Sequence, residues 1–128
     1  MSNTSNLQDV QGYYQCKIKE NKPELLILTS SLKEVMLLRE FGIDAMAIHG
    51  ENSTYDQDFI RHIKKYCKNI MSLYDWDEAG YKASDKLLEK YQIIPIPKPN
   101  YLNCKDLSDC YRENSELTKQ FIKTIYEQ

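Results

Sequence analysis

Short apolar runs alternate with amphipathic stretches along most of this chain. A short run without polar interruption is typical of a strand buried on both faces of a parallel sheet, and such runs lie at residues 24–29, 44–49, 69–74 and 93–96. The last run contains a proline, which fits an edge strand. Between the runs, and again from Ser115 onward, apolar residues recur at helical spacing. This alternation predicts an α/β fold with a central four-stranded, mostly parallel sheet, right-handed crossovers and helices on both faces.

Local signals indicate where several of these elements begin and end. Ser31 and Glu34 have the spacing of a helix capping box, and residues 54–57 repeat that spacing. Gly42 follows the apolar face of the first predicted helix, where a glycine commonly ends a helix. Residues 13–19 alternate weakly between apolar and polar side chains, which predicts an edge strand near the N-terminus.

Length and composition predict one globular domain. The chain has 128 residues, of which 41% are hydrophobic and 28% are charged. We expect a polar N-terminal extension over residues 1–22 that holds the edge strand, a main domain over residues 23–113, and a helix over residues 114–128 packed on it. No apolar stretch approaches the roughly 18 residues of a membrane helix, and the first residues lack the basic and apolar regions of a signal peptide. We therefore expect a cytoplasmic protein with no membrane partner.

Cysteine usage and net charge narrow the function classes further. Cys16, Cys67, Cys104 and Cys110 form no C-x-x-C pair, and the chain has only two histidines. Neither a zinc site nor a disulfide framework is expected, and the simpler interpretation is four reduced cysteines. The net charge of −2 argues against a strong electrostatic footprint for nucleic acid. A metal or a neighbouring domain would have to supply much of the attraction for such a ligand.

Two acids lie at the junction between the third apolar run and the next helical segment. Asp75 and Asp77 follow a predicted strand, so they lie at the carboxyl edge of the sheet, where open α/β sheets bind ligands. Two carboxylates held there suit Mg²⁺, which prefers oxygen ligands and shares itself with phosphates. The alternative is that Asp77 caps the helix while Glu78 complements its dipole. The small residues Ala79 and Gly80 favour the metal interpretation because they allow a ligand or another backbone to approach.

The order of these pieces resembles the Toprim domain, a catalytic module shared by bacterial-type primases, topoisomerases and some nucleases. The similarity covers roughly residues 23–113 and implies a Toprim-like fold. Residues 75–80 match the D-x-D with trailing Ala-Gly of primases, and Lys105 with Asp106 resembles a later Lys-Asp. Residues 29–34, followed by residues 41–45, are similar to the Toprim domains of phage-type primases and primase-helicases.

One part of the family pattern is missing. Most Toprim domains carry Glu-Gly at the end of the first core strand, where this chain has Ser30-Ser31. Glu34 lies one helical turn further on, but the capping box explains it without chemistry. Our hypothesis is that Glu51, just beyond the second strand, supplies the missing carboxylate. Lys33 would then face a phosphate, with a solvated helix surface as the alternative.

The resemblance implies a metal site and a reaction. Asp75, Asp77 and Asp106 would hold Mg²⁺ or Mn²⁺, and Lys105 would neutralise a phosphate oxygen unless it is only a surface lysine. The implied activity is metal-dependent nucleotidyl transfer by a phage-type DNA primase that makes RNA primers. The implied partners are a single-stranded DNA template and nucleoside triphosphates, with a replicative helicase or a zinc-finger module. Trp76, between the two acids, would pack under the strand or stack on a base.

Two other functions stay open at this point. A Toprim nuclease would use the same acidic edge to activate water. A non-catalytic Toprim-like module for nucleic-acid binding or assembly would explain the absence of the usual glutamate.

Overall fold

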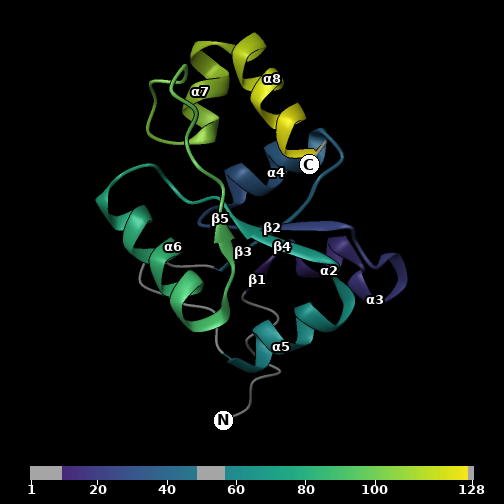
Figure 1. Cartoon of the computed structure of the whole chain (residues 1–128). Coiled ribbons are helices and arrows are strands. Elements are labelled where there is room, and N and C mark those ends of the chain that lie inside the picture. The colour runs from purple at the N-terminus through teal and green to yellow at the C-terminus, as the bar shows by residue number, and fades with distance from the viewer. Residues whose placement is uncertain (1–9, 49–56, 127–128) are drawn as a thin grey trace.

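The computed structural model describes residues 10–48 and 57–126. From β2 to β5, strands and helices alternate along the chain in the predicted way (Figure 1). The elements in order are β1 (Val10–Gln11), α2 (Tyr13–Cys16), α3 (Ile18–Asn21), β2 (Leu25–Thr29), α4 (Leu32–Glu40), β3 (Asp44–Ile48), α5 (Gln57–Tyr66), β4 (Asn69–Ser72), α6 (Glu78–Tyr91), β5 (Ile94–Pro95), α7 (Leu107–Glu113) and α8 (Ser115–Tyr126).

The strands form one sheet in the order β1-β3-β2-β4-β5. The four strands β3, β2, β4 and β5 are parallel, which confirms the predicted α/β fold. β1 adds a fifth, antiparallel edge strand beside β3. β2 lies at the centre, and its Leu28 is in register with Met46 of β3 and Ser72 of β4.

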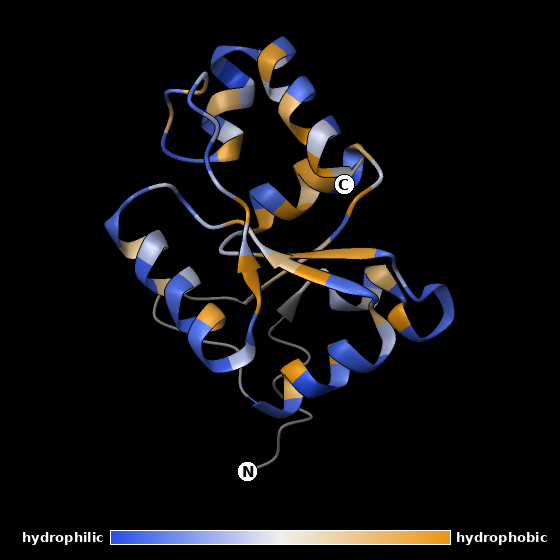
Figure 2. Ribbon diagram, viewed as in Figure 1, coloured by the Kyte–Doolittle hydropathy of each residue, from blue (hydrophilic) through white to orange (hydrophobic). Residues whose placement is uncertain are grey.

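Helices cover both faces of this sheet because β2 buries side chains on both. Leu26 and Leu28 point into one core and Ile27 into the other, and all three are fully buried. α4, α7 and α8 pack on the Ile27 face, whereas α2, α3, α5 and α6 pack on the opposite face (Figure 1). Polar residues dominate the outer sides of α5 and α6 (Figure 2), whereas α4 also exposes the apolar side chains of Leu32 and Met36.

The N-terminal region departs from the sequence prediction. Residues 13–19 form most of the two short helices α2 and α3, so the edge strand predicted there is wrong; the strand precedes them as β1. Gly12 and Lys17 adopt left-handed backbone conformations, with φ of 90° and 48°, and each turns the chain. Tyr13, Cys16 and Ile18 are consequently buried in the core, so this segment is part of the domain's packing.

The C-terminal helix α8 contributes to the hydrophobic core. α8 buries Phe121, Ile122 and Ile125 against the Ile27 face of the sheet. Cys104 and Cys110 are joined by a disulfide with a Cα–Cα distance of 5.4 Å, so the prediction of four reduced cysteines is wrong for this pair. Sequence spacing alone did not indicate the pairing, because the turn into α7 brings the two residues together. Within the described ranges, none of the helices is long and apolar enough to cross a membrane.

Candidate functional site

The acidic residues gather where the chain leaves the centre of the sheet. β2 and β4 are neighbours, but the chain passes from β2 to β3 on one side and from β4 to β5 on the other. The carboxyl ends of such a strand pair form a topological switch point, the usual ligand site of an open α/β sheet. Asp75 and Asp77 follow β4 at this point, and Glu34 lies in the first turn of α4, just after β2.

Close backbone packing fixes the Asp75 loop. A Cβ atom on Gly80 would lie only 1.8 Å from the carbonyl oxygen of Asp75, so this position of α6 requires glycine. On the other side, the Trp76 backbone N–H donates to the carbonyl oxygen of Lys105 over 2.6 Å. Gly80 was expected to let a ligand or another backbone approach closely, and the group that approaches it is the backbone of Asp75. These contacts hold the D-x-D segment beside Lys105 and Asp106.

Two of the predicted metal ligands also act as helix caps. Asp77 is the N-cap of α6, and its Oδ1 accepts from the Gly80 backbone N–H over 2.8 Å. Asp106 is the N-cap of α7 and accepts in the same way from the Asp109 N–H over 2.8 Å. The capping interpretation is therefore confirmed for Asp77. A metal bound here would use the remaining carboxylate oxygens of these two residues.

Glu34 is a buried carboxylate at the same edge, with 2% of its surface exposed. Its Oε1 accepts from the Ser31 hydroxyl over 2.6 Å, and its Oε2 accepts from the Ser108 backbone N–H over 2.8 Å. The predicted capping box is wrong in its bonding, because Ser31 donates to Glu34 and makes no side-chain bond to the helix amides. Glu34 instead satisfies a free amide at the start of α7 and joins that helix to α4.

The neighbouring acids affect the pKa of Asp75. The pKa of the Asp75 carboxyl is raised from 3.8 to about 6. Burial is the largest cause, the neighbouring carboxylates Asp106, Glu34 and Asp77 add to it, and Lys105 opposes it. A half-buried carboxylate with three acidic neighbours gains from a bound cation, since the cation would offset both desolvation and repulsion.

The donor set fits a hard divalent cation by type, because it consists of carboxylate oxygens at a partly open sheet edge. Among residues 10–48 and 57–126, however, no three acidic, histidine or cysteine side chains converge closely enough to hold a metal ion. The metal role of Asp75, Asp77 and Asp106 therefore stays a prediction.

The other predicted site residues differ in where they lie. Lys105 is exposed next to Asp106, and Lys33 is exposed on α4. Glu51 lies outside the described residues. The ring of Trp76 packs edge-on against Phe121, with 5.9 Å between the ring centroids, so the packing alternative for Trp76 is confirmed.

Comparison with known proteins shows the family of this chain. A family model described as Toprim-like matches residues 27–111, which is about two thirds of the chain. The chain belongs to the Toprim-like family. The resemblance and the Toprim-like fold expected from the sequence are both confirmed. Membership does not by itself assign a substrate to this Toprim-like domain.

Two of the proteins that this chain resembles are primases. The DNA primase of Haemophilus influenzae is 29% identical over 83 residues, which are 64% of this chain and 14% of the primase. The crystal structure of the Aquifex aeolicus primase, containing its zinc-binding and RNA polymerase domains, matches with a TM-score of 0.67 and 23% identity. That match covers 90% of this chain and 29% of the Aquifex chain. The Toprim-like chain thus spans a small part of each primase.

Sequence reasoning missed one connection at the site. Glu34 was interpreted as a capping residue within its own helix, whereas it reaches Ser108, which is 74 positions away. A carboxylate in an otherwise apolar helix face was the only available signal, because Val35, Leu37 and Leu38 around it are all core residues.

Proposed function

We propose that this Toprim-like domain is the catalytic part of a phage-type DNA primase that joins ribonucleotides into primers on single-stranded DNA. The observation that carries the proposal is the raised pKa of Asp75 among neighbouring carboxylates at the topological switch point. The primase relatives support the choice of reaction over other Toprim chemistries. Nucleoside triphosphates and a DNA template are the proposed substrates, with a helicase or zinc-finger module as partner and a cytoplasmic location.

Asp75 is the residue best placed to hold Mg²⁺ or Mn²⁺, with the second oxygens of Asp77 and Asp106 beside it. When bound, the ion would screen phosphate charge and lower the pKa of an attacking hydroxyl. The N-cap bonds of Asp77 and Asp106 fix the orientation of both carboxylates, which is the positioning that phosphoryl transfer requires. Lys105 is exposed beside these acids and would pair with a phosphate oxygen. Glu51 and Lys33 stay as proposed contributors.

A magnesium titration tests the metal site directly. We expect heat of binding for the wild-type chain in isothermal titration calorimetry and at least a tenfold weaker response for Asp75→Asn. The control is Asp85→Asn, which removes an exposed carboxylate on α6 away from the acidic edge. Equal binding by all three proteins, or binding by none, would contradict the metal site.

A second assay separates the possible reactions. Labelled ribonucleotide incorporation on a single-stranded template, with Mg²⁺ or Mn²⁺, should be present in the wild type and lost in Asp75→Asn. Strand cleavage without incorporation would favour the nuclease. Neither activity, together with intact folding, would favour the non-catalytic module, which the capping roles of Asp77 and Asp106 also accommodate.

A further inference from the structure

Positive charge is concentrated in two segments that the fold brings together. Residues 13–24 and 57–68 contain seven of the 17 lysines and arginines but only three of the 19 acids. Their net charge is therefore +4, and the remainder of the chain carries −6. The net charge of −2, which argued against a nucleic-acid footprint, conceals this separation.

Three of the four cations of the second segment project from one side of α5. Phe59, Ile60 and Ile63 bury the opposite side in the core. Helical spacing places Arg61, Lys64 and Lys65 within one outward arc of α5. Lys68 follows the helix, just before β4, and all four side chains are exposed.

The local partners of these cations leave their positive charge available to a ligand. Arg61 lies 3.4 Å from Asp58, and Lys68 lies 3.8 Å from Glu24, both as exposed pairs of the kind that contributes little. Lys64 donates to the backbone carbonyl of Tyr91, which removes no positive charge. The Lys65 ammonium lies 5.6 Å from the centroid of the Tyr66 ring.

α3 adds cations beside α5. The two segments are held together by a 2.6 Å hydrogen bond between the Tyr13 hydroxyl and His62 Nε2. Burial lowers the pKa of His62, and the charges of Lys19 and Lys65 lower it further, so one lysine from each helix acts on the same ring. A cationic surface therefore extends from α3 onto α5.

Two more lysines in this surface occupy strained backbone positions. Lys17 and Lys22 have φ of 48° and 46°, in the left-handed region that glycine adopts without penalty. A side chain there costs on the order of 1 kcal/mol. Both positions carry lysine in spite of that cost, and both side chains are exposed at the ends of α3.

α6 provides a contrast within the same molecule. It has as many lysines as acids in alternation, namely Glu78, Lys82, Asp85, Lys86, Glu89 and Lys90. Such a balanced helix surface is typical of simple solvation. The imbalance on α3 and α5 is thus a property of that face and not of every helix in this chain.

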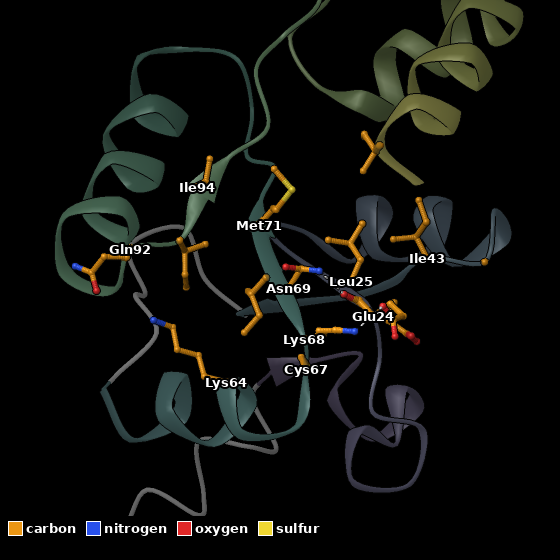
Figure 3. Close-up of a pocket in the computed structure, with 15 residues that line it drawn as sticks. Glu24, Leu25, Ile43, Lys64, Cys67, Lys68, Asn69, Met71, Gln92 and Ile94 are labelled. Atoms are coloured by element: carbon orange, nitrogen blue, oxygen red, sulfur yellow. Dashed lines mark hydrogen bonds and ion pairs between the residues drawn. The ribbon is translucent and has the colours of Figure 1, made fainter. Parts of the chain in front are cut away.

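A pocket of about 800 Å³ adjoins the cationic surface at the amino-terminal edge of the sheet (Figure 3). Lys64 and Lys68 line it together with the amides of Asn69 and Gln92 and apolar side chains that include Ile70. Two acids also line the pocket, Glu24, which pairs with Lys68, and Asp44, which pairs with Arg39. Amide groups and apolar side chains in one pocket suit a nucleobase that is not stacked in a duplex, and the adjacent lysines suit its phosphates.

We propose that the α3–α5 face and this pocket bind single-stranded nucleic acid, with the phosphates on the lysine and arginine row and unstacked bases in the pocket. The pocket is lined by the first residues of β3 and β4, so it lies at the opposite sheet edge from Asp75. The face would hold a strand away from the acidic edge, and binding there does not require the proposed primase activity.

Fluorescence anisotropy of a labelled 20-nucleotide oligothymidylate, in EDTA and at several salt concentrations, tests the proposal. The triple variant Lys19→Gln/Arg61→Gln/Lys65→Gln should bind at least tenfold more weakly at low salt. The slope of log affinity against log salt should fall by about 2, because each lost phosphate contact contributes about 0.7 for single strands. The matched control, Lys82→Gln/Lys86→Gln/Lys90→Gln, removes the same charge from α6 and should bind as the wild type does.

Other outcomes have defined meanings. No binding by the wild type, or equal loss in both triple variants, would overturn the proposal. So would equal or tighter binding of a duplex of the same length, or of polyglutamate. The single variant Lys65→Glu gives a second test if the triple variant melts at a lower temperature. Asp75→Asn should bind the strand normally in EDTA, so failure of the metal site and failure of this surface are distinguishable.

Discussion

At the scale of one side chain, the raised pKa of Asp75 affects both the stability of the fold and the proposed binding of a metal. Its folded-state pKa of about 6 lies above the ordinary value of 3.8. The folded protein therefore binds this proton more tightly than the unfolded chain does, and the stabilisation is lost as pH rises from about 4 to about 6. Above that range the charged carboxylate destabilises the fold in the absence of a cation, first through its burial and then through repulsion by its acidic neighbours.

The Asp75→Asn variant should consequently melt at a higher temperature than the wild type at pH 7.5 in EDTA. It should also lose the part of the pH dependence between pH 4 and 6 that belongs to Asp75. The pKa of Asp44 is raised by burial as well, so only the difference between wild type and variant isolates Asp75. Millimolar Mg²⁺ should raise the melting temperature of the wild type and leave the variant unchanged. Thermal melts at several pH values measure both effects, and a less stable variant in EDTA would contradict the repulsion.

Gly80 gives a second prediction at this scale. Alanine normally stabilises a helix interior by about 1 kcal/mol over glycine, but a Cβ here would overlap the Asp75 carbonyl at 1.8 Å. Gly80→Ala should destabilise the domain by at least about 2 kcal/mol, because backbone atoms must move. Gly42→Ala is the matched control. A Cβ at Gly42 would meet no atom within 4 Å, so only the left-handed φ of 81° disfavours alanine, and we expect a cost of about 1 kcal/mol. Urea unfolding measures both, and a stabilised Gly80→Ala would show that the loop is not packed this way.

Among the elements, α4 and α7 are coupled through one buried carboxylate. Glu34 accepts hydrogen bonds from Ser31 of the α4 N-cap and from Ser108 in the first turn of α7. Glu34→Ala leaves the Ser108 amide without its partner and opens a cavity, so a loss of about 2–4 kcal/mol is expected. Glu34→Gln keeps one acceptor oxygen and should cost less. It also removes one of the charges that raise the pKa of Asp75, which should therefore fall in an NMR titration. An unchanged Asp75 titration would mean that the two carboxylates do not interact.

Elements differ in how well the sequence predicts them. The runs that became β2, β3 and β4 were identifiable because a central parallel strand is apolar on both faces. The segment that became α2 and α3 was not, since two left-handed residues, Gly12 and Lys17, break any single period. The D-x-D position was predictable from where a strand ends. The Glu34–Ser108 and Cys104–Cys110 contacts were not, because both depend on how the loop before α7 folds back.

At the scale of the whole molecule, acids and cations occupy different regions. The carboxyl edge of the sheet gathers Glu34, Asp75, Asp77 and Asp106, while α3 and α5 carry the excess of lysine and arginine. Net charge is an average over the chain and cannot report this separation. The acidic edge repels a negatively charged ligand unless a metal cation is bound there. The cationic surface on α3 and α5 attracts the same ligand with no need for a metal.

The packing of α8 limits how this chain can be shortened. A cut after Glu113 would look harmless from the matched range of residues 27–111, yet it would remove Phe121, Ile122 and Ile125 from the hydrophobic core. Each such side chain contributes roughly 2–5 kcal/mol, and their sum approaches the entire 5–15 kcal/mol that holds an average domain together. We expect a fragment ending at residue 113 to give a collapsed, poorly dispersed amide spectrum, whereas a fragment ending at residue 126 should give the spectrum of a folded protein. Deletion mapping of any activity in this chain would therefore report unfolding at the C-terminal boundary before it reports the location of a site.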